Sequence, residues 1–315
     1  MRIVILDSYT INPGDLSWES LEQLGEVVCY DRTSKDNDQE ILERIGDADI
    51  VITNRIPISG DVLTRCQKLR LICVIDNGLE VVDTNIAKQR GITVLNVEAD
   101  GAFSLAQTAI AMLLELCHRI QNHSDSVARG DWEHCEDFCY WLNSPVELYG
   151  KTIGIVGASK AGLICSDIAL ALGMDVLIYD EQQQTDINYV DIDVLIRNSD
   201  VILLIGKLSA GFKYLISSEN IKKMKREVIV INSTAAEYIN ESDLAAALNS
   251  GRIAAAALDI VSTDPIMSSN PLLNAKNCLI TPRIGWVTKE NRNRILDDIA
   301  AKIALFYKEN LTDGL

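Results

Sequence analysis

The sequence predicts an α/β protein made of two doubly wound parallel-sheet domains, each sheet being covered by helices. Short apolar runs rich in β-branched residues alternate with helical stretches along nearly all of the 315 residues. The runs are continuously apolar instead of alternating, which is typical of parallel strands buried on both faces. A chain of 315 residues is also long enough for two domains, each with its own core.

Five of the apolar runs lie in the first hundred residues and predict the strands of one small domain. They are Ile3–Leu6, Val27–Tyr30, Ile50–Thr53, Leu71–Ile75 and Ile92–Leu95. A helical pattern then extends from Phe103 to Ala128 and ends near Gly130. We expect one long helix in this segment.

A second strand–helix series begins after Gly150 and predicts another parallel sheet. Its strands are Thr152–Val156, Asp175–Tyr179, Val201–Ile205, Val228–Ile231, Ala254–Leu258 and Cys278–Ile280. Within this series Glu241–Ser250 has a clear helix start and stop, because Asn240 can cap it and Gly251 follows it.

The last helical segment, Thr288–Tyr307, has one apolar face and returns the chain to the first domain. We therefore predict that residues 1–98 and 286–315 form one domain and that residues 99–285 form a second domain inserted into it.

The composition excludes several classes of partner and site. The net charge of −16 disfavours nucleic acid and anionic membrane surfaces, and a site for a small anion would need local positive charge. The first apolar run is too short for a signal peptide. The eight cysteines form no CxxC pair, and His134, Cys135 and Cys139 lack an evident fourth ligand, so we expect reduced thiols, no metal and a cytoplasmic location.

The strongest local motif is a glycine-rich turn that follows a predicted strand and opens a helix. Gly157 permits a tight turn, and Gly162 permits close packing of the helix on the strand. The N–H groups at the helix start, around Lys160 and Ala161, are suited to a pyrophosphate. The motif predicts a Rossmann-type dinucleotide-binding domain.

An acidic residue at the end of the next strand completes this motif. Asp180 lies 18 residues after Gly162 and would accept hydrogen bonds from the adenosine ribose. Glu181 is also acidic and would repel a 2′-phosphate, so NAD(H) is predicted in preference to NADP(H). One position departs from the pattern, since the middle glycine is Ser159, whose Cβ would point toward the pyrophosphate.

Several further motifs together resemble the NAD-dependent D-2-hydroxyacid dehydrogenases, in particular the hydroxypyruvate reductase and glycerate dehydrogenase branch. The similar segments are the glycine turn with Asp180, Ala257–Ile260, Asp264–Pro265, Asn270–Leu273, Thr281–Trp286, Ser104–Gln107, and Asp76, Asn77 and Gly78 with Val82 and Asp83. The resemblance covers nearly the whole chain. It implies a flavodoxin-like substrate domain that carries the inserted Rossmann domain.

The resemblance also implies roles for individual residues. It assigns the substrate loop to Asp76, Asn77 and Gly78. It adds to the cofactor site the residues Ser104, Gly206, Thr234 and Asp259, the last of these to hold the nicotinamide carboxamide. The predicted ligands are NAD(H) and a small 2-hydroxy or 2-keto acid, such as glycerate or hydroxypyruvate, or another small anion.

The family's three catalytic positions are changed in this chain. The resemblance places the substrate-binding arginine at Ala235, the glutamate at Asp264 and the histidine at Arg283. Loss of a carboxylate clamp removes a charge-assisted contact, and loss of an acid–base group typically costs ~10²–10⁴ in rate. Arginine stays protonated and cannot shuttle the proton. Arg283 could instead pair with Asp264, which we favour, or bind an anionic ligand.

Two functional hypotheses follow. The first is an NAD(H)-binding oxidoreductase related to this family, with ordinary turnover in doubt because of Ala235 and Arg283. The second is a non-catalytic protein that responds to NAD or serves as a structural partner of an active homologue. The resemblance also implies a homodimer, in which the aromatic segment containing Phe138, Tyr140 and Trp141 lies near the dimer contact.

Overall fold

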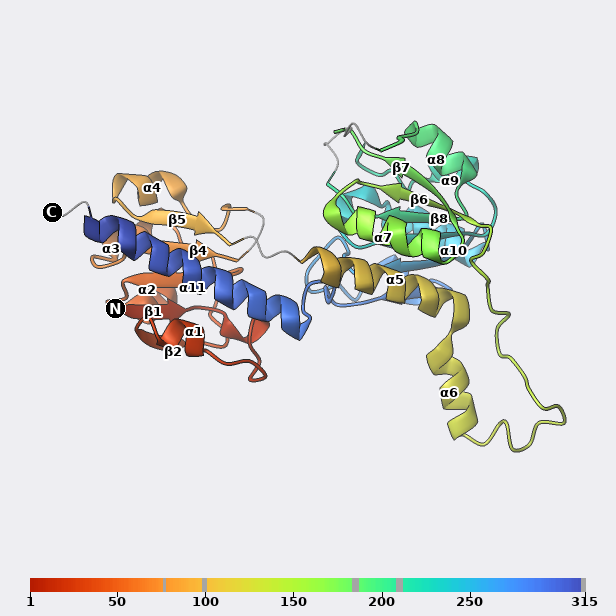
Figure 1. The fold of residues 1–315 in the computed structure, drawn as a ribbon, viewed down its shortest axis with the longest axis horizontal. Coiled ribbons are helices and arrows are strands. Elements are labelled where there is room, and N and C mark those ends of the chain that lie inside the picture. Colours follow the sequence, from red (N-terminus) through yellow and green to blue (C-terminus); the bar gives the residue numbers. More distant parts are fainter. Residues whose placement is uncertain (76–77, 98–100, 183–186, 208–211, 313–315) are drawn as a thin grey trace. The chain divides into compact units, whose positions relative to one another are not determined.

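The computed structural model describes residues 1–75, 78–97, 101–182, 187–207 and 212–312. The chain divides into two compact units (Figure 1). Unit 1 contains Met1–Asp100 and Val287–Leu315, and unit 2 contains Gly101–Trp286. Each unit has its own parallel sheet with helices on both faces, so the predicted fold class is confirmed.

Unit 1 contains a five-stranded parallel sheet in the order β2-β1-β3-β4-β5. The strands are β1 (Arg2–Ile5), β2 (Glu26–Cys29), β3 (Ile50–Thr53), β4 (Leu71–Val74) and β5 (Thr93–Asn96). The helices are α1 (Glu19–Glu22), α2 (Asp38–Ile45), α3 (Gly60–Arg65), α4 (Thr84–Gln89) and α11 (Lys289–Thr312). Helices α2, α3 and α4 share one apolar core with the sheet, and α11 runs beside α1 (Figure 1).

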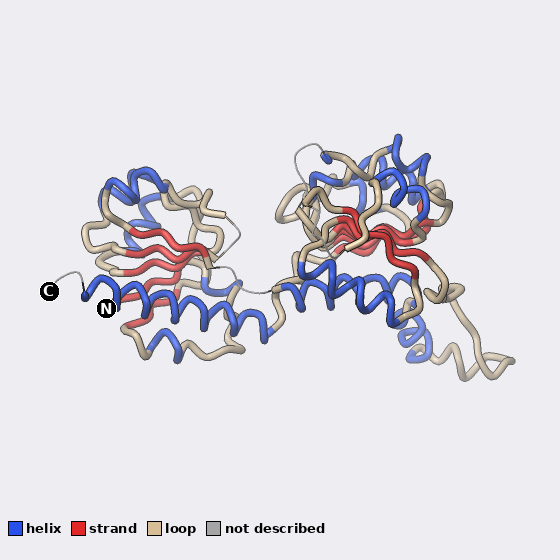
Figure 2. Tube along the Cα trace, turned by 45° about the horizontal axis from the view of Figure 1, so that its top comes forward, coloured by secondary structure: helices blue, strands red, loops and turns tan. Residues whose placement is uncertain are grey.

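Unit 2 contains a six-stranded parallel sheet in the order β11-β10-β9-β8-β6-β7. The strands are β6 (Thr152–Val156), β7 (Asp175–Tyr179), β8 (Val201–Leu204), β9 (Val228–Asn232), β10 (Ile253–Leu258) and β11 (Cys278–Ile280). The helices are α5 (Ala102–His118), α6 (Ile120–Ala128), α7 (Lys160–Ala171), α8 (Ile192–Asn198), α9 (Ser218–Lys223) and α10 (Glu241–Asn249). Helices α5 and α7 pack together in one core and α8 to α10 in the other (Figure 2).

The expectation of a single helix from Phe103 to Ala128 was wrong. The helix is broken at Arg119, which has the left-handed backbone angles φ 50° and ψ 44° and so ends α5 before α6 begins. The two halves also differ in environment, because α5 buries eight residues and α6 buries only Ser126. The break turns α6 away from the rest of unit 2 (Figure 1).

The predicted strands and the helix that begins at Glu241 agree closely with the structure, whereas the last helix extends beyond the predicted end at Tyr307 to Thr312. The strands differ from the predicted ranges by at most about one residue at each end, which is the usual ambiguity of strand limits. Asn240 caps α10 as expected, since its side chain accepts a hydrogen bond from the Asp243 N–H at 3.1 Å. None of the helices within the described ranges is sufficiently long and apolar to span a membrane.

The eight cysteines are all free thiols. Cys66, Cys73, Cys117 and Cys165 are buried, whereas Cys29 and Cys139 are exposed. Burial raises the pKa of Cys73 and that of Cys165 to about 12. These two thiols therefore stay protonated near neutral pH and serve as small apolar core residues.

Candidate active site

The glycine turn, residues 157–162, is the first part of the site and connects β6 to α7. Gly157 has φ +107°, and a Cβ on it would lie 2.2 Å from the Gly206 Cα. A Cβ on Gly162 would lie 2.3 Å from the Gly157 carbonyl oxygen. Three backbone segments therefore approach one another so closely that only glycine fits. This is the close backbone cradle that a dinucleotide pyrophosphate needs at a helix N-terminus.

Ser159 is the N-cap of α7, and its hydroxyl is held within the turn. The hydroxyl donates a hydrogen bond to the Ile205 carbonyl at 2.9 Å and accepts one from the Gly162 N–H at 3.2 Å. Serine is among the best N-cap residues because its oxygen satisfies an otherwise unpaired N–H group. The serine that replaces the middle glycine thus stabilises the helix start, and its polar atom faces the protein.

Asp180 lies directly after β7 and contacts the same turn. Its carboxylate accepts hydrogen bonds from the Ala158 N–H at 2.6 Å and from the Gln182 N–H at 2.8 Å. A carboxylate has about four acceptor positions, so two bonds leave capacity for the hydroxyls of a ribose. Asp180 therefore orders the turn and keeps acceptor positions of the kind that its predicted role requires.

The other residues predicted to contact a cofactor lie in different environments. Ala161 is buried in the first turn of α7, and the Lys160 ammonium lies 5.2 Å from the centre of the Phe103 ring. The Thr234 hydroxyl donates to the Leu204 carbonyl at 3.1 Å. Ser104 is only 4% exposed, and its hydroxyl donates to the Gly285 carbonyl at 2.7 Å, so it fastens the start of α5.

The second part of the site is a pocket of about 400 Å³ at the carboxyl edge of the unit 2 sheet, which we call the carboxyl-edge pocket. Its lining residues are Lys207, Thr234, Ala235, Ala236, Glu237, Tyr238, Ile260, Val261, Ser262, Asp264 and Arg283. They follow the strands β8, β9, β10 and β11, which are neighbours in the sheet. Loops beyond the carboxyl ends of parallel strands are the usual place for ligands in such folds.

The strand register explains why these residues meet. Leu204 of β8 pairs with Asn232 of β9, and Asn232 also pairs with Leu258 of β10. Leu258 in turn pairs with Ile280 of β11. Three residues beyond this row, the chain places Lys207, Ala235, Val261 and Arg283. All four line the carboxyl-edge pocket, with Lys207 and Arg283 as its cations and Ala235 and Val261 as small or apolar residues.

Asp259 positions the turn that carries Arg283. It is 3% exposed, and its carboxylate accepts hydrogen bonds from the Thr281 hydroxyl at 2.6 Å, the Ile284 N–H at 2.7 Å and the Gly285 N–H at 2.8 Å. Arg283 itself has φ +56°, a conformation that a non-glycine residue adopts only where its surroundings impose it. The resemblance assigns the Asp259 carboxylate to the nicotinamide carboxamide. In the structure this carboxylate is largely occupied by the hydrogen bonds that shape the turn.

Arg283 and Asp264, to which the resemblance assigns a histidine and a glutamate position, form the expected ion pair. The side chains are 36% and 42% exposed, so water screens the pair and its contribution to stability is small. The Arg283 Nε is not aligned for a hydrogen bond to the carboxylate. Ala235 is held nearby by the buried Asn232, whose amide donates to the Ala235 carbonyl at 2.8 Å.

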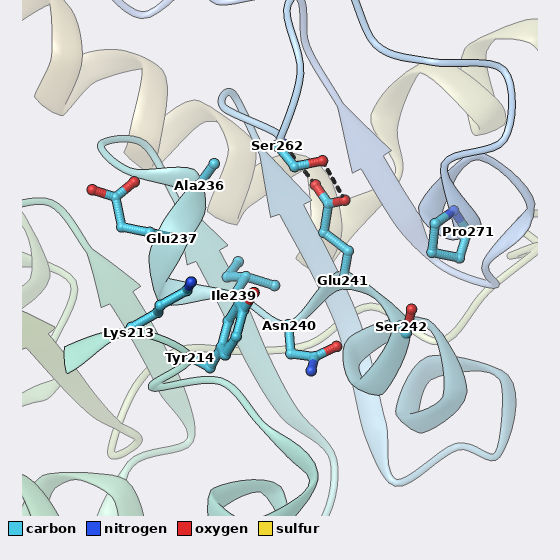
Figure 3. Close-up of a pocket in the computed structure, with 10 residues that line it drawn as sticks. All are labelled: Lys213, Tyr214, Ala236, Glu237, Ile239, Asn240, Glu241, Ser242, Ser262 and Pro271. Carbon is cyan, nitrogen blue, oxygen red and sulfur yellow. Dashed lines mark hydrogen bonds between the residues drawn. The ribbon is translucent and has the colours of Figure 1, made fainter. Parts of the chain in front are cut away.

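A second pocket of about 410 Å³ adjoins the first, and Figure 3 shows its lining. The two pockets share Ala236, Glu237 and Ser262 as lining residues. Lys213 points into the second pocket, whereas Glu241 is bound to the N–H and hydroxyl groups of Ser262 at 2.8 and 2.7 Å (Figure 3). Motif analysis found neither Lys207 nor this second pocket; the signal available was that Lys207 closely follows a predicted buried strand.

Part of the predicted substrate loop lies outside the described residues. Asp76 and Asn77 belong to that part, so their predicted role stays a prediction. Gly78 is described, and it lies against the side chain of Glu80. Among the described residues, no group of three or more His, Cys, Asp or Glu side chains could hold a metal ion.

Comparison with known proteins assigns the chain to a family. Residues 110–285 match the model described as D-isomer specific 2-hydroxyacid dehydrogenase, NAD binding domain. The chain belongs to the D-isomer specific 2-hydroxyacid dehydrogenase family. A hydroxypyruvate reductase from Blautia hydrogenotrophica is 46% identical over 313 residues, which are 98% of this chain and 97% of that protein.

More distant members of this dehydrogenase family cover most of the chain as well. A glycerate dehydrogenase from Methylorubrum extorquens is 34% identical over 85% of both chains. The structure of D-lactate dehydrogenase from Escherichia coli aligns with a TM-score of 0.81 at 22% identity, covering 100% of this chain and 98% of that one. The last comparison concerns the fold alone, and it agrees with two parallel-sheet α/β domains.

Proposed function

We propose that this protein is an NAD(H)-binding oxidoreductase of small 2-keto and 2-hydroxy acids, such as hydroxypyruvate and glycerate, whose turnover is limited by its own catalytic positions. The observation that carries the proposal is the juxtaposition of an intact glycine turn and a carboxyl-edge pocket on one sheet. The family membership and the two hydroxyacid-dehydrogenase relatives supply the substrate class.

The glycine turn fits a dinucleotide. Gly157, Gly162 and Gly206 leave a cradle that any Cβ would fill, and the first turn of α7 offers N–H groups to phosphate. Asp180 and Glu181 favour NAD(H) over NADP(H), since two acidic residues would repel a 2′-phosphate. When bound, the dinucleotide supplies the hydride for the keto carbon of the substrate.

The protein's own residues limit the proton transfer that must accompany the reduction. Arg283 stands where the family has its histidine, and a guanidinium does not release its proton near neutral pH. Asp264 is engaged with that guanidinium. Ala235 contributes no charge to a substrate carboxylate, so substrate binding is weaker than in the family pattern. Proton delivery is weaker because of Arg283.

A second candidate function is a non-catalytic, NAD-responsive or structural partner of an active homologue. Ala235 and Arg283 favour it, because both replacements remove chemistry without disturbing the fold. The glycine turn is preserved, which favours dinucleotide binding by the oxidoreductase and by the non-catalytic partner alike.

The first test is calorimetric titration of the cofactor-free protein with NADH and with NADPH. We expect NADH to bind and NADPH to bind at least about tenfold more weakly, which corresponds to about 1.4 kcal/mol. The absence of NADH binding would eliminate both the oxidoreductase and the NAD-responsive proposals.

The second test restores the family's side chains with the double substitution Ala235→Arg and Arg283→His. We expect hydroxypyruvate-dependent oxidation of NADH to rise by ~10²–10⁴, the usual contribution of an acid–base group. Lys213→Ala, in the neighbouring pocket, serves as the control and should leave the rate at the wild-type level. A double variant that binds NADH and remains inert would show that these two positions do not account for the limit.

The segment from α6 to residue 149 supports the proposal of a homodimer. It carries exposed large apolar side chains, namely Ile120, Val127, Trp132, Phe138, Trp141, Leu142 and Tyr149. A group of exposed aromatic residues on a projecting element is typical of a protein interface (Figure 1). Light scattering should give twice the chain mass, and Phe138→Asp combined with Trp141→Asp should convert the dimer into a monomer.

A further inference from the structure

Lys207 occupies a position between the glycine turn and the carboxyl-edge pocket. The residue before it, Gly206, packs backbone to backbone on the turn, since a Cβ on Gly206 would lie 2.4 Å from the Gly157 Cα. The Gly206 N–H also donates to the Val156 carbonyl at 3.1 Å. The backbone directly before Lys207 is therefore fixed against the glycine turn, and Lys207 itself lines the carboxyl-edge pocket.

Lys207 and Ala235, the position at which the resemblance places the family's arginine, line the same pocket. Leu204 and Asn232 are paired, and Lys207 and Ala235 each lie three residues beyond that pair. The segments beyond β8 and β9 stay linked, because the Ser233 N–H donates to the Leu204 carbonyl at 3.1 Å. The long stem of a lysine can thus extend over the methyl group of Ala235.

The two cations of the pocket differ in how they are held. Arg283 is engaged by Asp264, whereas Lys207 is exposed and forms no ion pair within the described ranges of the chain. Of the two cations in the pocket lining, Lys207 is therefore the one available to an anion, and its charge must outweigh the lining carboxylate of Glu237. In a protein with a net charge of −16, such a local cation is what a small anionic ligand requires.

We propose that Lys207 binds the carboxylate of the small 2-keto or 2-hydroxy acid and so replaces, from the adjacent strand, the cation missing at Ala235. This inference rests on the proposed function for the identity of the substrate. An ammonium is a point charge and lacks the planar fork of a guanidinium. The carboxylate is consequently held by one charge, with less control of its orientation than a bidentate arginine gives.

The probe in this experiment is oxalate, a small dicarboxylate that NADH does not reduce. Its affinity is measured by calorimetry for the full chain, with and without saturating NADH, in the wild type, Lys207→Met, Lys207→Arg and Lys213→Met. Lys213 is the matched control, because it lines the neighbouring pocket, which shares Ala236 and Glu237 with the carboxyl-edge pocket (Figure 3). Thermal unfolding verifies that each variant is folded.

We expect Lys207→Met to weaken oxalate binding by about tenfold or more, as for loss of a charged hydrogen bond. Lys207→Arg should keep most of the affinity, Lys213→Met should match the wild type, and adding Ala235→Arg to Lys207→Met should restore binding. The inference is overturned if the wild type binds no oxalate, or if Lys207→Met binds it normally. It is also overturned if Lys207→Met loses NADH affinity alone, since the ammonium would then serve the dinucleotide.

These outcomes separate the inference from the proposed function. Oxalate binding that depends on Lys207 in a protein without NADH binding or reductase activity would leave the anion site standing and remove the oxidoreductase. If NADH binding and turnover are unchanged by Lys207→Met, the oxidoreductase function stands and the anion-binding role of Lys207 is removed.

Discussion

The glycine turn and the carboxyl-edge pocket lie at the same edge of one sheet, but they differ in what each requires of its residues. In the turn the requirement is space, since a Cβ on Gly157, Gly162 or Gly206 would lie within 2.4 Å of backbone atoms. In the pocket the requirement is charge, and the resemblance places the arginine and histidine of the family at Ala235 and Arg283. The glycines that the turn requires for space are therefore kept, whereas the charged residues of the pocket differ from those that the resemblance implies.

The hydrogen bonds that hold the two turns of the pocket come from Asn232 and Asp259, and do not come from the side chains of Ala235 and Arg283. Asp259 and Asn232 are both buried, and they hold the two turns through hydrogen bonds. Ala235 and Arg283 lie on those turns without holding them. Side chains at these two positions can consequently change while the geometry of the pocket is kept. A cation for the pocket can then come from the segment after another strand, as we propose for Lys207.

The largest effect is expected from Gly157→Ala, which tests whether space governs the turn. The new Cβ would lie 2.2 Å from the Gly206 Cα at φ +107°. The left-handed backbone costs about 1–2 kcal/mol and the overpacking about 1–3 kcal/mol of the free energy of unfolding. We expect a lower midpoint of thermal unfolding and loss of NADH binding in calorimetry.

Gly14→Ala is the matched control, because Gly14 has φ +109° and no atom lies within 4 Å of the position that a Cβ would take. It should cost only the backbone contribution, about 1–2 kcal/mol, and leave NADH binding intact. Equal destabilisation by the two substitutions would mean that the close approach to Gly206 is not the reason for the glycine.

These particulars also show how far the sequence predicts the molecule. The strands follow from continuous apolar runs, and the Arg283–Asp264 pair follows from opposite charges on two motifs. The break at Arg119 could not be predicted, because an arginine carries no signal for a left-handed conformation. Lys207 was missed for a related reason: its place in the pocket depends on the pairing of β8 with β9, which brings Lys207 and Ala235, 28 positions apart in the sequence, to one pocket.

A smaller effect is expected at Ser159, where the turn departs from three glycines. Ser159→Ala removes the N-cap of α7 and should lower the free energy of unfolding by about 1 kcal/mol, whereas Ser159→Gly should cost a few tenths. NADH affinity should be the same in the wild type and Ser159→Gly, since the hydroxyl is bonded to Ile205 and Gly162. If Ser159→Gly binds NADH about tenfold more tightly, the serine obstructs the pyrophosphate and the turn is not intact.

The smallest effect on stability, and the sharpest test of the pocket, is expected from Asp264→Asn. The ion pair with Arg283 is more than one-third exposed on both sides, so its loss should change the free energy of unfolding by less than about 1 kcal/mol. Removing the carboxylate leaves Arg283 available to an anion and deletes one negative charge, so oxalate should bind severalfold more tightly than in the wild type.

Asp243→Asn, on α10, is a control for the change in net charge. If oxalate affinity rises equally in both variants, the gain comes from the overall field of the protein; a gain in Asp264→Asn alone places the effect in the pocket, where charge is the property that changed.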